Sequence, residues 1–580
     1  MNRIALPLLA FCLSPVRLAC CAFDLDHGPA PSLAVSNGDE AKAIATLARP
    51  RARIERDENN PSRPVVAVYI DQRPRSIGGD ATAAEVRCLR SFVHLQRLDL
   101  SSDRLTDADL DSLEPLKELR SLSLLCRHVG DAGLEHLSRL ARLERLQLRC
   151  PMVTDAGIAR LKTLKRLRSF DIAGSNVTGA GLECLKDLPD FRELWVPRDM
   201  TDSGLEHLKA LAHLQKLNLS GALVTGIGLR HLAGLPELVE LDLSSSQVSD
   251  AGLVGIEGLT QLQALELHMT QVTDGALVHL RGLTQLRTLD VEMTGVTGNG
   301  LRYLNPLTQL QAVDLTHTAL TDAGLSGIER LTSLHKLNLA QTEITDAGLK
   351  HLQGLTRLQK LDLRETKVTG TGLRFLKGLT QLRELDLLDT SADDAGLEQI
   401  RGFGQLQKLR LARTKVTDAG LENVNGLTHL RELNLLGLRI TDAGLSHLKS
   451  LTQLESLGLG TGLITDAGLE HLEALKQLRE LGLGQNSRVT DAGLRNLAGL
   501  TRLERLSIRG SKVTDAGLAN LEGLTELRDL NLDGTNVTDL GTAHLARLRN
   551  LRELSLVGTS VTGAGTESLR KALPAVQINR

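Results

Sequence analysis

Hydrophobic positions return along this chain at a fixed spacing. The pattern LxxLxL, with another apolar residue at a few positions, occurs twenty times between residues 95 and 556. Of the nineteen steps between successive copies, seventeen are 24 residues long, one is 23 and one is 25. A period of this length indicates a solenoid, in which each repeat buries its apolar side chains against its neighbours.

Each copy predicts a strand, a loop and a short helix. In the copy that begins at Leu358, Leu361 and Leu363 alternate as they do along a strand, whereas Leu373 and Leu376 are three residues apart and share one side of a helical turn. Thr or Ser precedes the helix in eighteen of the twenty copies, which suits an N-cap. An Asp often follows and complements the helix dipole.

The consensus LxxLxLxxTxVTDAGLxxLxxL resembles the leucine-rich repeat, in the version with Thr-Asp-Ala-Gly-Leu found in long bacterial proteins. The resemblance covers about residues 65–578. It implies an α/β fold, a right-handed horseshoe-shaped solenoid with a parallel β-sheet on its concave side and short helices on its convex side. Where the family often has Asn or Cys after the strand, this chain usually has Thr, as at Thr270 and Thr366. We expect these hydroxyls to bond backbone groups of the loop.

The segments outside the repeats predict a leader and two caps. The apolar run Ile4 to Val16 precedes small residues, as in a signal peptide, and the residues around Cys21 resemble the lipobox of bacterial lipoproteins. The predicted divisions are a signal peptide over 1–22, a tether over 23–50, an N-terminal cap built on a hairpin over 51–94, leucine-rich repeats over 95–560 and a C-terminal cap over 561–580.

Composition narrows the function. The 580 residues are 41% hydrophobic but only 2% aromatic, so leucine fills the core. The net charge of −2 provides no overall field to attract nucleic acid or an anionic membrane. Four of the seven cysteines lie beyond the leader, too few for a disulfide scaffold. Cys126 and Cys150 share one repeat position in adjacent repeats, and both a disulfide and two reduced thiols remain open.

Catalytic and metal-binding motifs are missing from the sequence. It contains no HExxH, GxSxG or GxxxxGK[ST], so we predict no catalytic residues, no cofactor, no small-molecule substrate and no metal site. Eight histidines precede the second helical leucine of their repeats, where we expect a solvated helix surface rather than a zinc site. They are His136, His207, His231, His279, His351, His447, His471 and His544.

The concave sheet carries the candidate partner-binding residues, because its outward positions have no role in the core. Equivalent residues of parallel strands form ladders with a spacing of about 4.8 Å. The position between the last two leucines of the strand carries a row of carboxylates, which either is simply a solvated surface or selects a basic partner. Its members are Asp242, Glu266, Asp290, Asp314, Asp362 and Asp386.

A second group surrounds the only tryptophan. Trp195 occupies the same ladder position in the fifth repeat, with Arg145, Arg149, Asp171 and Arg198 nearby. An exposed tryptophan beside arginines has the composition of an interface hot spot. The alternative is a tryptophan that lies flat and seals a repeat that is one residue short.

These observations favour an exported, non-enzymatic scaffold that binds a protein or peptide on its concave face. We expect it in the periplasm, on the cell surface or secreted, with membrane contact only through a lipid anchor and without nucleic acid as a partner. The alternative is a cytoplasmic substrate-recognition adaptor, because the VTDAGL unit also resembles the repeats of F-box ubiquitin-ligase proteins.

Overall fold

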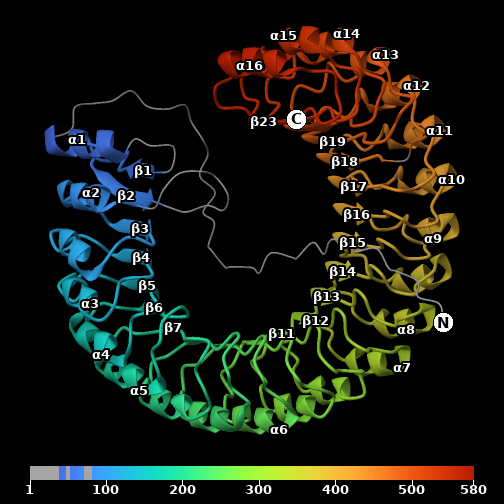
Figure 1. Cartoon of the computed structure of the whole chain (residues 1–580). Coiled ribbons are helices and arrows are strands. Elements are labelled where there is room, and N and C mark those ends of the chain that lie inside the picture. Colours follow the sequence, from blue (N-terminus) through green and yellow to red (C-terminus); the bar gives the residue numbers. More distant parts are fainter. Residues whose placement is uncertain (1–37, 48–51, 71–80, 461) are drawn as a thin grey trace, which may run out of the picture.

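The strands of this protein line the inner side of a horseshoe and its short helices line the outer side (Figure 1). The computed structural model describes residues 38–47, 52–70, 81–460 and 462–580. A single sheet of 23 strands runs through them. The predicted leucine-rich-repeat solenoid, with a concave parallel sheet, is confirmed. The signal peptide predicted over 1–22 lies outside the described residues.

Each strand pairs with the next along the chain. From β2 to β23 every neighbour is parallel and in register, whereas β1 and β2 are antiparallel. The strands are β1 (Ala52–Arg56), β2 (Val65–Ile70), β3 (Arg97–Ser101), β4 (Ser121–Leu125), β5 (Arg145–Arg149), β6 (Ser169–Asp171), β7 (Glu193–Trp195), β8 (Lys216–Asn218), β9 (Glu240–Asp242), β10 (Ala264–Glu266), β11 (Thr288–Asp290), β12 (Ala312–Asp314), β13 (Lys336–Asn338), β14 (Lys360–Asp362), β15 (Glu384–Asp386), β16 (Lys408–Arg410), β17 (Glu432–Asn434), β18 (Ser456–Gly458), β19 (Glu480–Gly482), β20 (Arg505–Ser507), β21 (Asp529–Asn531), β22 (Glu553–Ser555) and β23 (Gln577–Asn579). The twenty copies of the repeat correspond to β3 through β22.

Most helices are one or two turns long, as the spacing of the helical leucines predicts. The α-helices are α1 (Gly38–Leu47), α2 (Ala83–Cys88), α3 (Gly133–Leu137), α4 (Asp155–Ile158), α5 (Gly179–Leu182), α6 (Asp250–Leu253), α7 (Asp322–Leu325), α8 (Asp346–Leu349), α9 (Asp394–Gln399), α10 (Asp418–Leu421), α11 (Asp442–Leu445), α12 (Asp466–Leu469), α13 (Asp491–Arg495), α14 (Asp515–Leu518), α15 (Thr542–Leu545) and α16 (Gly563–Ala572). The 3-10 helices are η1 (Leu89–Ser91), η2 (Asp107–Leu113), η3 (Ala159–Thr163), η4 (Glu183–Asp187), η5 (Gly204–Ala210), η6 (Ile227–Gly234), η7 (Val254–Ile256), η8 (Ala276–Leu280), η9 (Leu301–Leu304), η10 (Ser326–Ile328), η11 (Lys350–Leu352), η12 (Gly370–Leu376), η13 (Glu422–Val424), η14 (Ser446–Leu448), η15 (Glu470–Leu472), η16 (Ala519–Leu521) and η17 (Asp539–Gly541). Within the described ranges, none of the helices combines the length and the apolar character needed to cross a bilayer.

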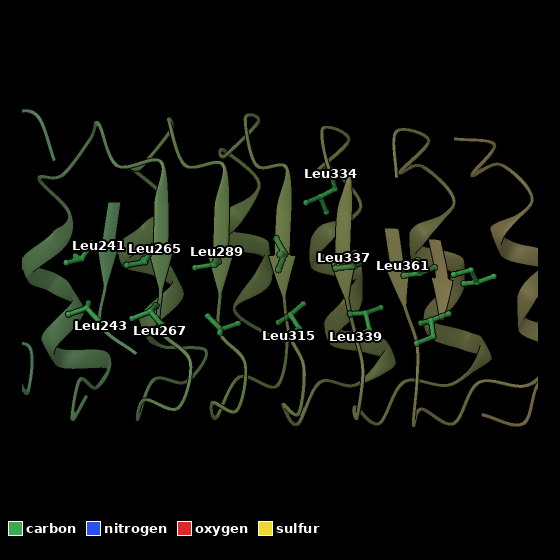
Figure 2. Close-up of a cluster of buried hydrophobic side chains, with 14 of the residues drawn as sticks. Leu241, Leu243, Leu265, Leu267, Leu289, Leu315, Leu334, Leu337, Leu339 and Leu361 are labelled. Atoms are coloured by element: carbon green, nitrogen blue, oxygen red, sulfur yellow. The ribbon is translucent and has the colours of Figure 1, made fainter. Parts of the chain in front are cut away.

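The core consists of leucine columns that run along the solenoid. Leu241 and Leu243 of one repeat lie beside Leu265 and Leu267 of the next, and all four are buried (Figure 2). Fully burying a leucine side chain contributes about 1.5–3 kcal/mol. Because every repeat contributes an equivalent set of buried apolar side chains, stability is distributed along the chain rather than concentrated in one core.

Threonine hydroxyls close the loop that follows each strand. The Thr366 hydroxyl donates a hydrogen bond to the carbonyl of Leu363 (2.6 Å), and Thr270 bonds Leu267 in the same way (2.6 Å). The expected bond from Thr to the loop backbone is therefore present. Asn486 replaces Thr in the repeat before the 25-residue step, and its buried amide donates to two carbonyls and accepts the N–H of Ile464.

Aspartate side chains join each repeat to the next at the entrance of the helix. Asp442, at the start of α11, accepts hydrogen bonds from the backbone N–H (2.9 Å) and the hydroxyl (2.6 Å) of Thr465 in the following repeat. The same two bonds recur at Asp131–Thr154, Asp155–Thr178, Asp202–Thr225, Asp250–Thr273, Asp274–Thr297, Asp322–Thr345, Asp346–Thr369, Asp394–Thr417, Asp418–Thr441, Asp466–Thr490, Asp491–Thr514, Asp515–Thr538 and Asp539–Thr562.

This contact also explains the glycine of the Thr-Asp-Ala-Gly motif. A Cβ placed on Gly468 would collide with Asp442 Oδ1, and Gly444 stands in the same relation to Asp418. The aspartate therefore does more than complement the helix dipole. It binds the next repeat, and the glycine leaves room for it.

The ends of the solenoid are covered. At the N-terminal end β2 pairs with β3 of the first repeat, and at the C-terminal end β23 pairs with β22. The sequence predicts a tether over 23–50, and this is wrong for residues 38–47, which form α1. Ala43 and Leu47 are one helical turn apart and are buried, and Glu40 pairs with Arg56 of β1 (3.8 Å). The segment is therefore part of the N-terminal cap.

Candidate functional site

The predicted carboxylates form one continuous row on the concave face of the sheet. Each occupies the last position of its strand, and the register places it directly beside its equivalent on the neighbouring strand. We call this row the acidic strip. Its members are Asp242, Glu266, Asp290, Asp314, Asp362 and Asp386, with Asn338 between the fourth and the fifth.

Aspartates of the strip also have a structural role, which the sequence analysis missed. Asp290 Oδ1 accepts the backbone N–H of Glu292 (2.8 Å), and Asp314 Oδ1 accepts that of Thr316 (3.0 Å). This Asx turn ends the strand. Asn338 makes the same bond to Ala340 (3.1 Å), so Asn replaces Asp without loss of the turn. The presence of Asn338 at a position that usually carries Asp is the sequence feature that could have indicated this turn.

Crowding of the carboxylates changes their protonation. Burial, followed by repulsion from Asp290 and Asp242, raises the pKa of Glu266 to about 8. Burial likewise raises the pKa of Asp290 and Glu292, and it raises the pKa of Asp362 to about 6. At neutral pH Glu266 therefore retains a proton and donates a hydrogen bond to Asp290. This proton reduces the repulsion within the strip.

Side chains of the protein bind both ends of the strip, but only one end has a charged partner. Asn218 donates to Asp242 Oδ2 (2.6 Å) at one end. At the other end Arg410 forms an ion pair with Asp386 (3.2 Å). Among the described residues, no ion pair reaches Glu266, Asp290 or Asp314. The Asn338 amide donates a hydrogen bond to Asp314 (3.0 Å), so within the described chain the charges of Asp290 and Asp314 have hydrogen bonds but no ion pair.

Three carboxylates at this centre lie within reach of a single cation. Ligand oxygens of Asp290, Glu292 and Asp314 are all within 4.8 Å of one another, and no other described group of His, Cys, Asp and Glu is as close. Carboxylate oxygens suit hard cations such as Ca²⁺ and Mg²⁺. The ammonium or guanidinium of a partner's Lys or Arg also matches this arrangement.

Trp195 lies two strands before the acidic strip. It is half-buried on β7, between Asp171 of β6 and Asn218 of β8. Arg149 approaches Asp171 at 4.0 Å, and Gln147 donates to the same carboxylate at 2.5 Å. The structure therefore brings Arg149 and Asp171 together beside the tryptophan.

The other two arginines of this group are exposed. Arg145 extends from β5, and Arg198 follows β7 and lies over Gly221 of the next repeat. Within the described chain neither forms an ion pair. The cationic side chains of Arg145 and Arg198 are therefore exposed near Trp195 without an ion pair among the described residues.

A hollow of about 710 Å³ lies over the strands at the C-terminal end of the concave face, β17 to β23. Its floor has no side chains where Gly458 and Gly482 are neighbours in the sheet. A Cβ on Gly482 would meet nothing closer than 3.8 Å. Arg505 and Glu480 of its lining form an ion pair with each other, whereas Asp529 and Glu553 of the same lining form none among the described residues.

Several helix-surface histidines contact glutamates instead of facing only solvent. Their Nδ1 atoms lie 2.5–2.7 Å from a glutamate of the preceding repeat. The hydrogen bonds from histidine lower the pKa of Glu114 and Glu522. These pairs join the convex side of adjacent repeats. They are His136–Glu114, His279–Glu257, His351–Glu329 and His544–Glu522.

Comparison with known proteins agrees with the repeat and the fold. The family described as Leucine Rich repeat matches residues 236–256 and 330–352. Together with the twenty copies of the repeat and the horseshoe of parallel strands, these matches define a solenoid of the leucine-rich-repeat class. The chain is a leucine-rich-repeat protein. No curated protein matches its sequence.

Solved structures share the architecture at low sequence identity. The fold is similar to that of the TLR13–ssRNA13 complex, with a TM-score of 0.55, 18% identity and coverage of 84% of this chain and 82% of that chain. An internalin from Listeria monocytogenes has a TM-score of 0.42 and 25% identity, and the match covers 56% of this chain and 82% of that one. A leucine-rich-repeat protein of Leptospira interrogans has a TM-score of 0.41 and 16% identity, over 87% and 100% of the two chains.

Proposed function

We propose that this protein is an exported, non-enzymatic scaffold that binds a protein or peptide on its concave face, with a basic segment of the partner on the acidic strip. The observation that carries the proposal is the charge at the centre of the strip. Asp290 and Asp314 have no ion pair among the described residues, whereas Asp386 at one end of the strip pairs with Arg410.

An opposite charge on the partner is the natural complement of this centre. A Lys or Arg side chain placed between Asp290, Glu292 and Asp314 would reduce the mutual repulsion of these carboxylates, which together with burial raises the pKa of Asp290 and of Glu292. One row of carboxylates, with a spacing of about 4.8 Å between strands, suits an extended segment with repeated basic residues. Phosphate groups would be repelled by the same charges. This favours a protein or peptide over nucleic acid, although the similar TLR13–ssRNA13 complex contains an RNA.

Trp195 supplies the second part of the proposed surface. Its ring is half-buried, and Arg145 and Arg198 are exposed near it. Large aromatic side chains and arginines contribute most to binding when a partner excludes water from them. The partner would thus place an apolar or acidic part on β7 and a basic part on β9 to β12.

The proposal is tested with a peptide rich in Lys and Arg and an acidic peptide of equal length, each titrated into the full chain by isothermal calorimetry. We expect only the basic peptide to bind. The double variant Asp290→Asn, Asp314→Asn should weaken it by roughly tenfold, because two charges are lost while the Asx turns remain.

A matched control removes two charges from the convex side. Glu398 of α9 and Glu422 of η13 are exposed, and Glu398→Gln with Glu422→Gln changes the net charge by the same amount. This control should bind the basic peptide like the wild type. An equal loss in both double variants would show only a general charge effect and would contradict the proposal.

A further inference from the structure

Cys126 and Cys150 occupy the same place in two consecutive repeats. Leu125 of β4 pairs in register with Arg149 of β5, and each cysteine is the next residue along the chain. Residues in register on neighbouring strands are separated by about 4.8 Å. Disulfides require a Cα separation of about 4.4–6.8 Å. The backbone therefore holds the two cysteines at a distance that a disulfide can span.

Burial and hydrogen bonding place the Cys150 thiol against the repeat that carries Cys126. Both cysteines are fully buried, with exposures of 1% for Cys126 and 0% for Cys150, and both are free thiols. The Cys150 thiol donates to the carbonyl of Leu124 in β4 (3.7 Å), so it points into the repeat that carries Cys126. The interaction between the two thiols, together with burial, raises the pKa of Cys126.

The other two described cysteines differ from this pair. The Cys88 thiol donates to the carbonyl of Glu85 (2.9 Å), and the Cys184 thiol donates to that of Gly181 (3.2 Å). Both are half-buried, and burial raises the pKa of each to about 11. Cys88 thus bonds the backbone of its own helix α2, and Cys184 of η4 bonds that of α5, which directly precedes it. They serve as internal controls for thiol reactivity in the same molecule.

We infer that Cys126 and Cys150 form a disulfide between adjacent repeats when the chain folds in an oxidising compartment. The thiolate of one cysteine attacks a disulfide reagent such as oxidised glutathione, which gives a mixed disulfide and one reduced glutathione. The second cysteine then attacks the mixed disulfide and releases the second reduced glutathione. Two protons and two electrons pass from the protein to the reagent.

Burial decides when this reaction takes place. Because neither sulfur is exposed in the folded state, exchange must occur before the two repeats close on each other. The product is then protected from reductants by the same leucine core. Closing the loop of about 25 residues restricts the unfolded chain, so the oxidised protein should melt at a higher temperature than the reduced protein.

Peptide mapping of the full chain tests the inference directly. The protein is unfolded with reductant, refolded with a mixture of oxidised and reduced glutathione, and then alkylated with N-ethylmaleimide in denaturant. Trypsin releases Cys126 in peptide 121–127 and Cys150 in peptide 150–160. We expect these two peptides linked to each other, 2 Da lighter than their sum, and Cys88 and Cys184 alkylated. Alkylation of Cys126 and Cys150 to the same extent as Cys88 would overturn the inference.

A second measurement keeps the test independent of refolding yield. The chain is produced with export to an oxidising compartment, and its melting is followed with and without reductant. Reductant should lower the melting temperature of the wild type by several degrees but should leave the variant Cys126→Ala, Cys150→Ala unchanged. Equal melting of wild type in both conditions, with both thiols alkylated, would contradict the inference.

Discussion

The contact between Asp442 and the next repeat can be measured by a double-mutant cycle with Gly468. Asp442 accepts two hydrogen bonds from Thr465, and its carboxylate fills the space beside Gly468 of α12. Asp442→Ala leaves a half-buried N–H and a hydroxyl without their acceptor. Gly468→Ala forces a methyl group into the carboxylate. The two substitutions disturb the same contact from its two sides.

The magnitudes follow from these contacts. Loss of two hydrogen bonds, each worth about 1–2 kcal/mol in a half-buried place, predicts that Asp442→Ala costs about 2–4 kcal/mol. Overpacking predicts that Gly468→Ala costs about 1–3 kcal/mol in the wild type. In the Asp442→Ala background the main clash is gone, and Ala has a helix propensity about 1 kcal/mol better than that of Gly. There Gly468→Ala should be neutral or stabilising by up to about 1 kcal/mol, which gives a coupling free energy of about 1–4 kcal/mol.

Urea unfolding followed by far-ultraviolet circular dichroism measures the free energy of unfolding of the four proteins, and hydrogen exchange localises the change to α12. Gly426→Ala is the matched control, because a Cβ there meets no atom within 4 Å. Its effect should add to that of Asp442→Ala without coupling. If Gly468→Ala had the same cost with and without Asp442, the proposed fit between aspartate and glycine would be refuted.

Three further predictions concern the core, the acidic strip and the tryptophan. Leu361→Ala removes a buried side chain of β14 and should lower the free energy of unfolding by about 2–5 kcal/mol in urea titrations. The raised pKa of Glu266 stabilises the fold fully below its unfolded value of about 4.5, and this contribution is lost as pH rises through about 8. Glu266→Gln should therefore resist urea better than the wild type above about pH 8 and no better near about pH 4. Because Trp195 is the only tryptophan, its emission should shift to shorter wavelength when a partner covers the concave face. An unchanged emission spectrum in a saturated complex would show that Trp195 is not part of the interface.

The order of strands and helices could be predicted from the sequence because each repeat carries the same local pattern. Leu361 and Leu363 indicate a strand, and Leu373 and Leu376 indicate a helical turn. Because the same pattern occurs twenty times, it cannot be a chance arrangement of leucines. Helix α1 was missed because its pattern occurs only once. Its only large apolar side chains are those of Ile44 and Leu47, and the burial of Ala43 and Leu47 depends on packing within the cap.

The candidate site could be predicted only as a row of positions. The spacing places Asp290 beside Asp314, but it does not show that each also ends its strand with an Asx turn. Nor does it show that Glu266 retains a proton or that Arg410 neutralises one end of the row. Those properties depend on burial and on contacts between residues about 24 positions apart, which only the stacked repeats bring together.

The most direct test of capture on the concave face is carboxyl footprinting of the protein with and without its bound native partner. Carbodiimide coupling labels exposed carboxylates, and peptide mass spectrometry reports the labelling of each one. We predict that the partner protects Asp290, Glu292 and Asp314 and leaves Glu398 and Glu422 on the convex side unchanged. Protection of the convex glutamates, with the acidic strip labelled as in the free protein, would contradict the account.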